Sequence, residues 1–173
     1  KDPKKRNIQI DQESKIEELS EINFDKSLKD NITCTADLHK QYRSLLGQIN
    51  WLQSRTQFQS CYSFSRCASA SAGPSIGDVR ALNKLARKIR SEEVCLRFWP
   101  LSGTSLRLIG CPDAAFRNNA DKSSQRGQTV FLAERREKGK VNIRGSLIDY
   151  ESQKIKRTVL STTVSELYAF MKC

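Results

Sequence analysis

Two carboxylates stand where a side chain could do chemistry. Asp113 follows a short apolar run at residues 106–109 that predicts a strand, and Glu166 comes one turn after the expected start of a helix at Ser161 or Thr162. Acidic residues gathered around two divalent ions can cleave a phosphodiester in line. Two carboxylates alone do not make such a site. Taken by themselves, they fit a solvated Asp in a turn and a Glu at a helix start better than they fit a metal site.

The segments between residues 36 and 91 are predicted to be helices. Apolar residues at steps of three and four predict a helix over 36–58, and the apolar stretch 58–72 predicts a second helix. We expect Phe58, Cys61, Tyr62 and Ser65 to share one face of that second helix. Ser75 and Asp78 form a capping-box pattern that opens a third helix. Its apolar face would consist of Val79, Leu82, Ala86 and Ile89.

After Arg90 the apolar residues alternate instead, which predicts short strands separated by turns. A last helix would begin at Ser161 or Thr162. About three helices, a sheet of short strands and one C-terminal helix make the fold class α+β. The expected organisation is a polar arm or linker at 1–35, a helical segment at 36–92 and a sheet domain at 93–173.

The charge of the chain is unevenly distributed. Its 173 residues carry a net charge of +11, yet residues 1–40 hold 8 Lys/Arg against 9 Asp/Glu. The excess therefore lies in the rest of the chain, and a basic body of this kind suits nucleic acid or another polyanion. The alternative explanation of this charge is a basic protein without a specific partner. The residues that would hold nucleic acid are Lys84, Arg87, Lys88, Arg135, Arg136 and Lys154.

Several classes of protein are disfavoured. No run approaches the roughly 18 apolar residues of a membrane-spanning helix, and the polar N-terminus lacks a secretion signal. We expect an intracellular protein, cytoplasmic or nuclear, with nothing in the sequence favouring an organelle. The six cysteines form no C-x-x-C pair and His39 is the only histidine, which disfavours a zinc site. The chain begins with Lys1, and we expect it to be a piece of something longer.

Seven short motifs, in order, resemble the C-terminal part of copia-type retrotransposon Pol polyproteins, from the end of the reverse transcriptase into the ribonuclease H domain. They are Tyr42-Arg-Ser-Leu-Leu-Gly47, Ser65-Arg66, Ala81-Leu-Asn-Lys-Leu-Ala-Arg87, Gly110-Cys-Pro-Asp113-Ala114, Asp121-Lys-Ser-Ser124 with Gly127 to Leu132, Ser152-Gln-Lys154, and Leu160-Ser-Thr-Thr163-x-x-Glu166. The resemblance covers roughly residues 40–173.

The resemblance implies a reverse-transcriptase thumb or connection-like segment at 36–92 and the N-terminal half of a ribonuclease H-like domain at 93–173. It further implies that Asp113 and Glu166 are catalytic ligands of Mg²⁺ or Mn²⁺, and that the substrate is an RNA·DNA hybrid. The family's later acidic ligands would lie beyond Cys173, and its polymerase motif Tyr-x-Asp-Asp is absent. We therefore expect the printed residues to hold an incomplete carboxylate set and to be inactive as a nuclease.

Three hypotheses follow. The first is a fragment or derivative of a Pol polyprotein whose ribonuclease H-like domain would cleave the RNA of a hybrid by two-metal hydrolysis. The second is a non-catalytic basic subunit of a larger protein or nucleoprotein assembly. The third is a plain nucleic-acid-binding module, whose affinity would fall steeply with salt.

Overall fold

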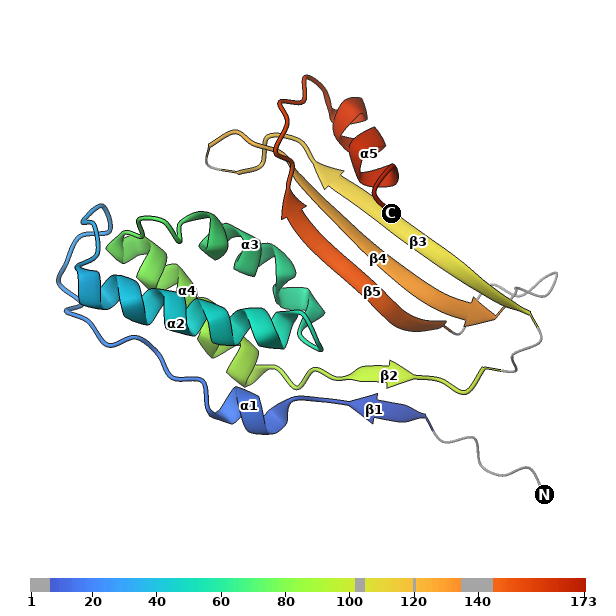
Figure 1. Cartoon of the computed structure of the whole chain (residues 1–173), viewed down its shortest axis with the longest axis horizontal. Helices are drawn as coiled ribbons and strands as arrows, with labels where there is room; N and C mark the ends of the chain where they lie inside the picture. Colours follow the sequence, from blue (N-terminus) through green and yellow to red (C-terminus); the bar gives the residue numbers. More distant parts are fainter. Residues whose placement is uncertain (1–6, 102–104, 120, 135–144) are drawn as a thin grey trace. The chain divides into compact units, whose positions relative to one another are not determined.

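A computed structural model describes residues 7–101, 105–119, 121–134 and 145–173 (Figure 1). The chain forms two units. One is a helical unit, Asp11–Cys95, and the other is a sheet unit that combines the N-terminal residues up to Ile10 with Leu96–Cys173. The expected organisation placed its boundaries at residues 35 and 92 instead.

The elements of the helical unit are α1 (Glu13–Glu17), α2 (Ala36–Gln53), a short 3-10 helix (Phe58–Ser60), α3 (Cys61–Ser69) and α4 (Ile76–Ser91). Those of the sheet unit are β1 (Ile8–Ile10), β2 (Leu96–Phe98), β3 (Leu106–Ala115), β4 (Gln125–Glu134), β5 (Gly145–Lys154) and α5 (Thr162–Phe170). Helices, then antiparallel strands, then one last helix confirm the predicted α+β class.

Helices α2, α3 and α4 pack around the core of the helical unit, each running roughly opposite to the one before it (Figure 1). The apolar stripe predicted for α2 is buried, with Tyr42 and Ile49 fully inaccessible to solvent. The Tyr42 hydroxyl donates a hydrogen bond of 2.7 Å to the carbonyl of Cys67, which ties α2 to α3. The stripe predicted for α4 is buried as well. Each larger apolar side chain in this core stabilises the unit by about 1.5–3 kcal/mol.

The ends of α4 follow the sequence signals closely. The Ser75 hydroxyl accepts from the backbone N–H of Asp78 at 3.3 Å, and the Asp78 carboxylate accepts from the backbone N–H of Ser75 at 2.8 Å. Both halves of the predicted capping box are therefore present. The face predicted for the second helix is only partly correct, because Cys61 is buried whereas Tyr62 and Phe58 are 38% and 39% exposed.

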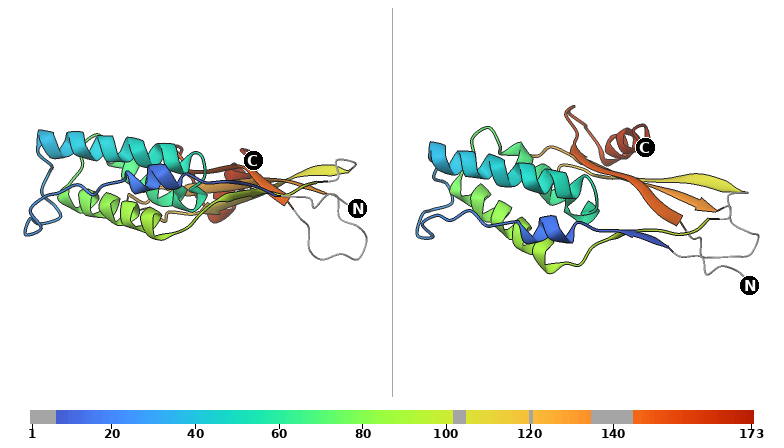
Figure 2. Two further views of the ribbon diagram at one scale, coloured as in Figure 1. Left: turned by 90° about the horizontal axis from the view of Figure 1, so that it is seen from below. Right: turned by 60° about the horizontal axis from the view of Figure 1, so that its bottom comes forward.

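The segment expected to be a polar arm is built into both units. Leu19 and Ile22 are 2% and 6% exposed and belong to the core of the helical unit. Further along, the backbone N–H of Ile76 donates to the carbonyl of Ile32 at 2.8 Å. Figure 2 shows the chain between α1 and α2 running beside the helices. The weak periodicity of Ile16, Leu19 and Ile22 hinted only at one short helix, and the helix observed there, α1, ends at Glu17, before Leu19 and Ile22.

The sheet unit centres on an antiparallel meander in which β3 pairs with β4 and β4 with β5 (Figure 1). The register between β3 and β4 runs without a break from Leu106 opposite Glu134 to Ala115 opposite Gln125. The three strands have ten residues each, longer than the short strands predicted, because the backbone ladder continues where apolar alternation stops. Pro112 fits β3 because this is an edge strand of the sheet.

Helix α5 packs on β3 and β4. Ser161 caps it as predicted, since its hydroxyl accepts from the backbone N–H of Val164 at 3.3 Å. The residues that α5 buries are small: Ser165 is 0% exposed and Ala169 is 1% exposed. The larger apolar side chains of this region remain exposed to solvent: Leu160, Val164, Leu167, Phe170 and Met171.

Candidate functional site

Asp113 lies in β3, two residues before the strand ends, and is exposed. Its partner across the ladder is Gly127 of β4. Glu166 lies in the second turn of α5 and is exposed too. The two carboxylates therefore belong to a strand and to a helix that packs on that strand.

The face of the sheet on which Asp113 projects follows from Gly110. A Cβ atom built on Gly110 would lie 2.4 Å from the Sγ of Cys173, just after α5, so this side of β3 faces the end of the helix. Side chains alternate between the two faces of a strand, and the register here is unbroken. Asp113, three residues further along, therefore projects from the opposite face of the sheet.

This geometry decides how well the pair suits a metal. Mg²⁺ keeps near-octahedral geometry with oxygen ligands, and a two-metal site needs several carboxylates converging on one point. Glu166 belongs to the helix on one face of the sheet, whereas Asp113 projects from the other. Within the described ranges, no three His, Cys, Asp or Glu side chains cluster. The residues described here do not fit a two-metal centre.

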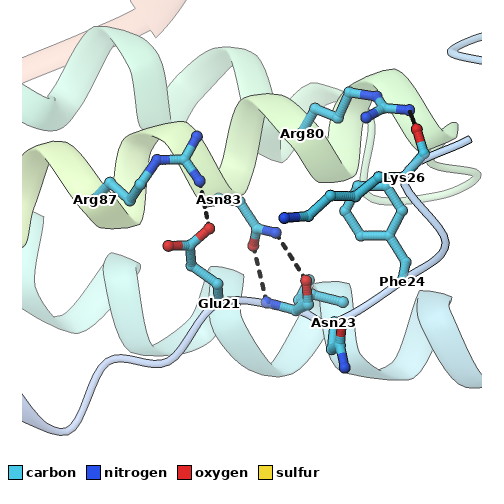
Figure 3. A pocket seen from close by; sticks show the side chains of 8 residues that line it. Glu21, Asn23, Phe24, Lys26, Arg80, Asn83 and Arg87 are labelled. Carbon is cyan, nitrogen blue, oxygen red and sulfur yellow. Dashed lines mark hydrogen bonds and ion pairs between the residues drawn. The ribbon is translucent and has the colours of Figure 1, made fainter.

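The basic residues of α4 divide into two stripes. Arg87 pairs with Glu21, and the Arg80 Nε donates to Asp30 at 2.7 Å. Both face a pocket of about 540 Å³ between α4 and the chain before α2 (Figure 3). In Figure 3 the Arg87 guanidinium points at the Glu21 carboxylate. Arg87, expected to contact nucleic acid, thus forms an ion pair with Glu21, although the Arg87 side chain is 57% exposed.

The second stripe lies on the side of α4 that faces α3. Lys84 and Lys88 line a groove of about 460 Å³ between these helices, and Arg66 reaches it from α3. Lys84 and Arg66 take part in no ion pair among the residues that the structure describes. Lys88 approaches Glu92 at 3.8 Å, with both side chains well exposed. Such an exposed pair is weak and readily exchanged.

One acidic residue lines the same groove. Asp78 is held by the N-terminus of α4, where one carboxylate oxygen accepts from the backbone N–H and the hydroxyl of Ser75, both at 2.8 Å. Cys67 lies at the base of the groove, and burial, assisted by the charge of Asp78, raises the pKa of its thiol to about 11. Three basic residues against this one carboxylate leave the groove with a net positive charge. The Cys67 thiol is protonated at neutral pH.

The three other predicted nucleic-acid residues are Lys154, Arg135 and Arg136. Lys154, at the end of β5, forms an ion pair with Asp121 in the loop between β3 and β4. The hydrogen bond from Lys154 lowers the pKa of the Asp121 carboxyl below its usual value, and the hydrogen bonds from Ser123 make a smaller contribution in the same direction. Arg135 and Arg136 lie outside the described residues. Of the six predicted nucleic-acid residues, the structure brings together Lys84 and Lys88.

Arg66 and Tyr62 are groove residues that the sequence analysis did not place in a nucleic-acid site. Both belong to α3, and Tyr62 lies along the groove with 38% of its surface exposed. The available signal was their spacing of four residues, which puts them on one side of a helix. Periodicity alone could not tell that this side faces the Lys84 stripe of α4.

Among the helices described here, none is both long and apolar enough to span a bilayer. The sequence matches no protein-family model and has no significant match among curated proteins.

Proposed function

We propose that this chain is part of a copia-type retrotransposon Pol polyprotein, or derives from one, and that its ligand is an RNA·DNA hybrid. It would span the end of the reverse transcriptase and the start of a ribonuclease H-like domain. An intracellular location, in the cytoplasm or the nucleus, belongs to the same proposal.

The order of the sheet unit supports this proposal most directly. Three antiparallel neighbours, β3, β4 and β5, are followed by α5, which packs on the first two. The family resemblance implies an acidic residue in the first strand and another in the following helix. Asp113 and Glu166 occupy these two elements.

We propose that residues 1–173 bind the RNA·DNA hybrid and do not cleave its RNA strand. Because Asp113 and Glu166 project on different sides of the sheet, they do not hold a metal pair. We propose binding of Mg²⁺ or Mn²⁺ and hydrolysis of the RNA strand only if further carboxylates complete a site with Asp113 or Glu166. Binding requires none of them, since Lys and Arg neutralise backbone phosphates directly.

The test is a binding and cleavage assay on the whole chain. Fluorescence anisotropy with a labelled RNA·DNA hybrid should reveal salt-dependent binding, and addition of Mg²⁺ or Mn²⁺ should produce no cleavage above that of an Asp113→Asn variant. Absence of hybrid binding at low salt would refute the proposal. Cleavage that the Asp113→Asn variant abolishes would refute the restriction to binding.

A second candidate function is a non-catalytic basic subunit of a larger assembly. The observation that favours it is the exposure of apolar side chains on and beside α5, where Leu160, Phe170 and Met171 are 70–80% exposed. Among the described strands, β3 pairs only with β4, which leaves its other edge unpaired. Sedimentation velocity tests this function. Association at micromolar concentration supports it, and a monodisperse monomer counts against it.

A further inference from the structure

The groove between α3 and α4 is a candidate binding site that needs neither Asp113 nor Glu166. We propose that this groove binds the sugar–phosphate backbone of nucleic acid through Arg66, Lys84 and Lys88. The inference rests on the proposed function in that the ligand is nucleic acid, and it names the surface that holds the ligand.

The charge balance of the groove favours an anionic ligand. Three cations and one carboxylate line it, and that carboxylate, Asp78, is already engaged by the Ser75 cap. Arg66 and Lys84 have no ion pair within the described part of the chain, and Lys88 has only a long, exposed one. By contrast, Arg80 and Arg87 on the other side of α4 are both paired. Lys84 and Lys88 therefore place positive charge on the side of α4 that faces α3, and Arg90, exposed in the last turn of α4, lies outside the groove.

The spacing of these cations suits a chain of phosphates. Lys84 and Lys88 are one helical turn apart, roughly 6 Å along the axis of α4. That separation is comparable to the distance between neighbouring phosphates of one strand. Arg66 comes from α3, and its planar guanidinium can hold a phosphate with two parallel hydrogen bonds. Two helices thus supply contacts for successive phosphates.

The remaining lining favours a polynucleotide over a single small anion. The groove contains no fully buried cation that would enclose one phosphate group, since Arg66, Lys84 and Lys88 are all exposed. The hydroxyl of Ser63 adds a hydrogen-bonding group to the wall, whereas that of Ser91 already donates to the carbonyl of Lys88 at 2.9 Å. Tyr62, 38% exposed, offers an aromatic surface beside the cations on which a sugar or base can pack.

The framework that carries the site is rigid. α4 begins with a complete capping box, and its inner face is held by fully buried residues including Val79 and Ile89. α3 is tied to α2 through the hydrogen bond between Tyr42 and Cys67. Such a framework holds the backbone of the cationic residues in fixed relative positions, so little backbone conformational entropy is lost on binding.

The experiment compares two charge-matched variants of the full chain. The groove variant replaces Arg66, Lys84 and Lys88 with Gln, and the control variant replaces Lys29, Lys40 and Arg43, exposed residues outside the groove, with Gln. Binding of a labelled RNA·DNA hybrid is measured by anisotropy over a salt series. Circular dichroism and thermal unfolding check that both variants fold.

We expect the groove variant to lose at least about tenfold in affinity and to reduce the slope of log K against log salt by about 1 for each phosphate contact removed. The control variant should stay within about threefold of the wild type. Equal losses in both variants, or an unchanged slope in the groove variant, would overturn the inference while leaving hybrid binding by the wild type intact. Failure of the wild type to bind would instead refute the proposed function.

Two further ligands separate nucleic acid from other anions. Inorganic phosphate at millimolar concentration should compete weakly with the hybrid, because a single phosphate meets few of the cations at once. Poly-glutamate should lose little affinity in the groove variant. A loss for poly-glutamate equal to that for the hybrid would assign the groove to polyanions in general and overturn the assignment to nucleic acid.

Discussion

The Asn83 side chain pairs with both backbone groups of Ile22. Its Oδ1 accepts from the N–H of Ile22 and its Nδ2 donates to the carbonyl of Ile22, both at 2.9 Å. Asn83 is 5% exposed, so these bonds are shielded from water. Figure 3 shows the amide of Asn83 reaching from α4 to the chain that precedes α2. One polar side chain thereby anchors a segment that has no secondary structure of its own at this point.

Asn83→Leu should destabilise the helical unit by about 2–6 kcal/mol, because two buried backbone groups would each lose a partner at a cost of about 1–3 kcal/mol. Urea unfolding followed by circular dichroism measures this change. Asn83→Asp keeps the acceptor for the Ile22 N–H but sets a carboxylate oxygen against the Ile22 carbonyl, so it should destabilise the unit as well. Lys84→Ala, on the exposed neighbour, should change stability by no more than about 0.5 kcal/mol. Similar stability of Asn83→Leu and the wild type would contradict the anchoring role.

The packing of α5 on the sheet predicts that a change at its small buried residue destabilises the protein more than the loss of its large exposed one. Ala169 is 1% exposed against the sheet, whereas the adjacent Phe170 is 70% exposed. Ala169→Leu should cost about 1–3 kcal/mol through overpacking. Phe170→Ser should change the free energy of unfolding of a monomer by less than about 0.5 kcal/mol. Thermal unfolding at low protein concentration tests the pair, and a larger loss for Phe170→Ser would contradict this placement of α5.

The ion pair between Asp121 and Lys154 predicts a pH dependence. The folded-state pKa of Asp121 lies below its usual value, so its contribution to stability is present above the unfolded pKa, near 4, and is lost as pH falls. Asp121→Asn should therefore lower the Tm slightly at pH 7, and this difference should shrink steadily as pH falls below about 4. The effect is small because the group is exposed and screened by salt. Asp149→Asn, at an exposed position of β5, is the control. A difference between wild type and Asp121→Asn that grew towards acid pH would contradict the sign.

The cysteines should differ in reactivity. Cys111 and Cys173 are exposed, whereas Cys67 is 7% exposed with its thiol pKa raised to about 11. Because the thiolate is the reactive form, maleimide at pH 7.5 should label Cys111 and Cys173 well before Cys67. Peptide mass spectrometry of timed samples measures the rates, and unfolding in guanidinium should equalise them. Labelling of Cys67 as fast as Cys111 in the folded chain would contradict its burial.

The same raised pKa has a consequence for stability at alkaline pH. The folded-state pKa of Cys67 lies above the unfolded value, so its contribution to stability is complete at neutral pH and is lost as pH rises through about 11.

Local signals determined much of this fold. The stripe of α2, the capping box of Ser75 and Asp78, and the cap at Ser161 are each contained within a few neighbouring residues, and each was predictable from them. The same holds for the α+β class, because the change of period after Arg90 reports the change from helices to strands.

Tertiary structure decided what depends on residues distant in sequence. Leu19 and Ile22 are buried in a core whose other residues are distant in sequence, and Asn83, some 60 positions away, hydrogen-bonds their segment to α4. The grouping of Arg66 with the Lys84 stripe required two helix faces to meet, which no periodicity specifies. The face on which Asp113 projects depended on strand register, since a shift of one residue would exchange the two faces of β3. Residue types are local properties of a sequence, whereas the meeting of side chains depends on packing across the whole unit.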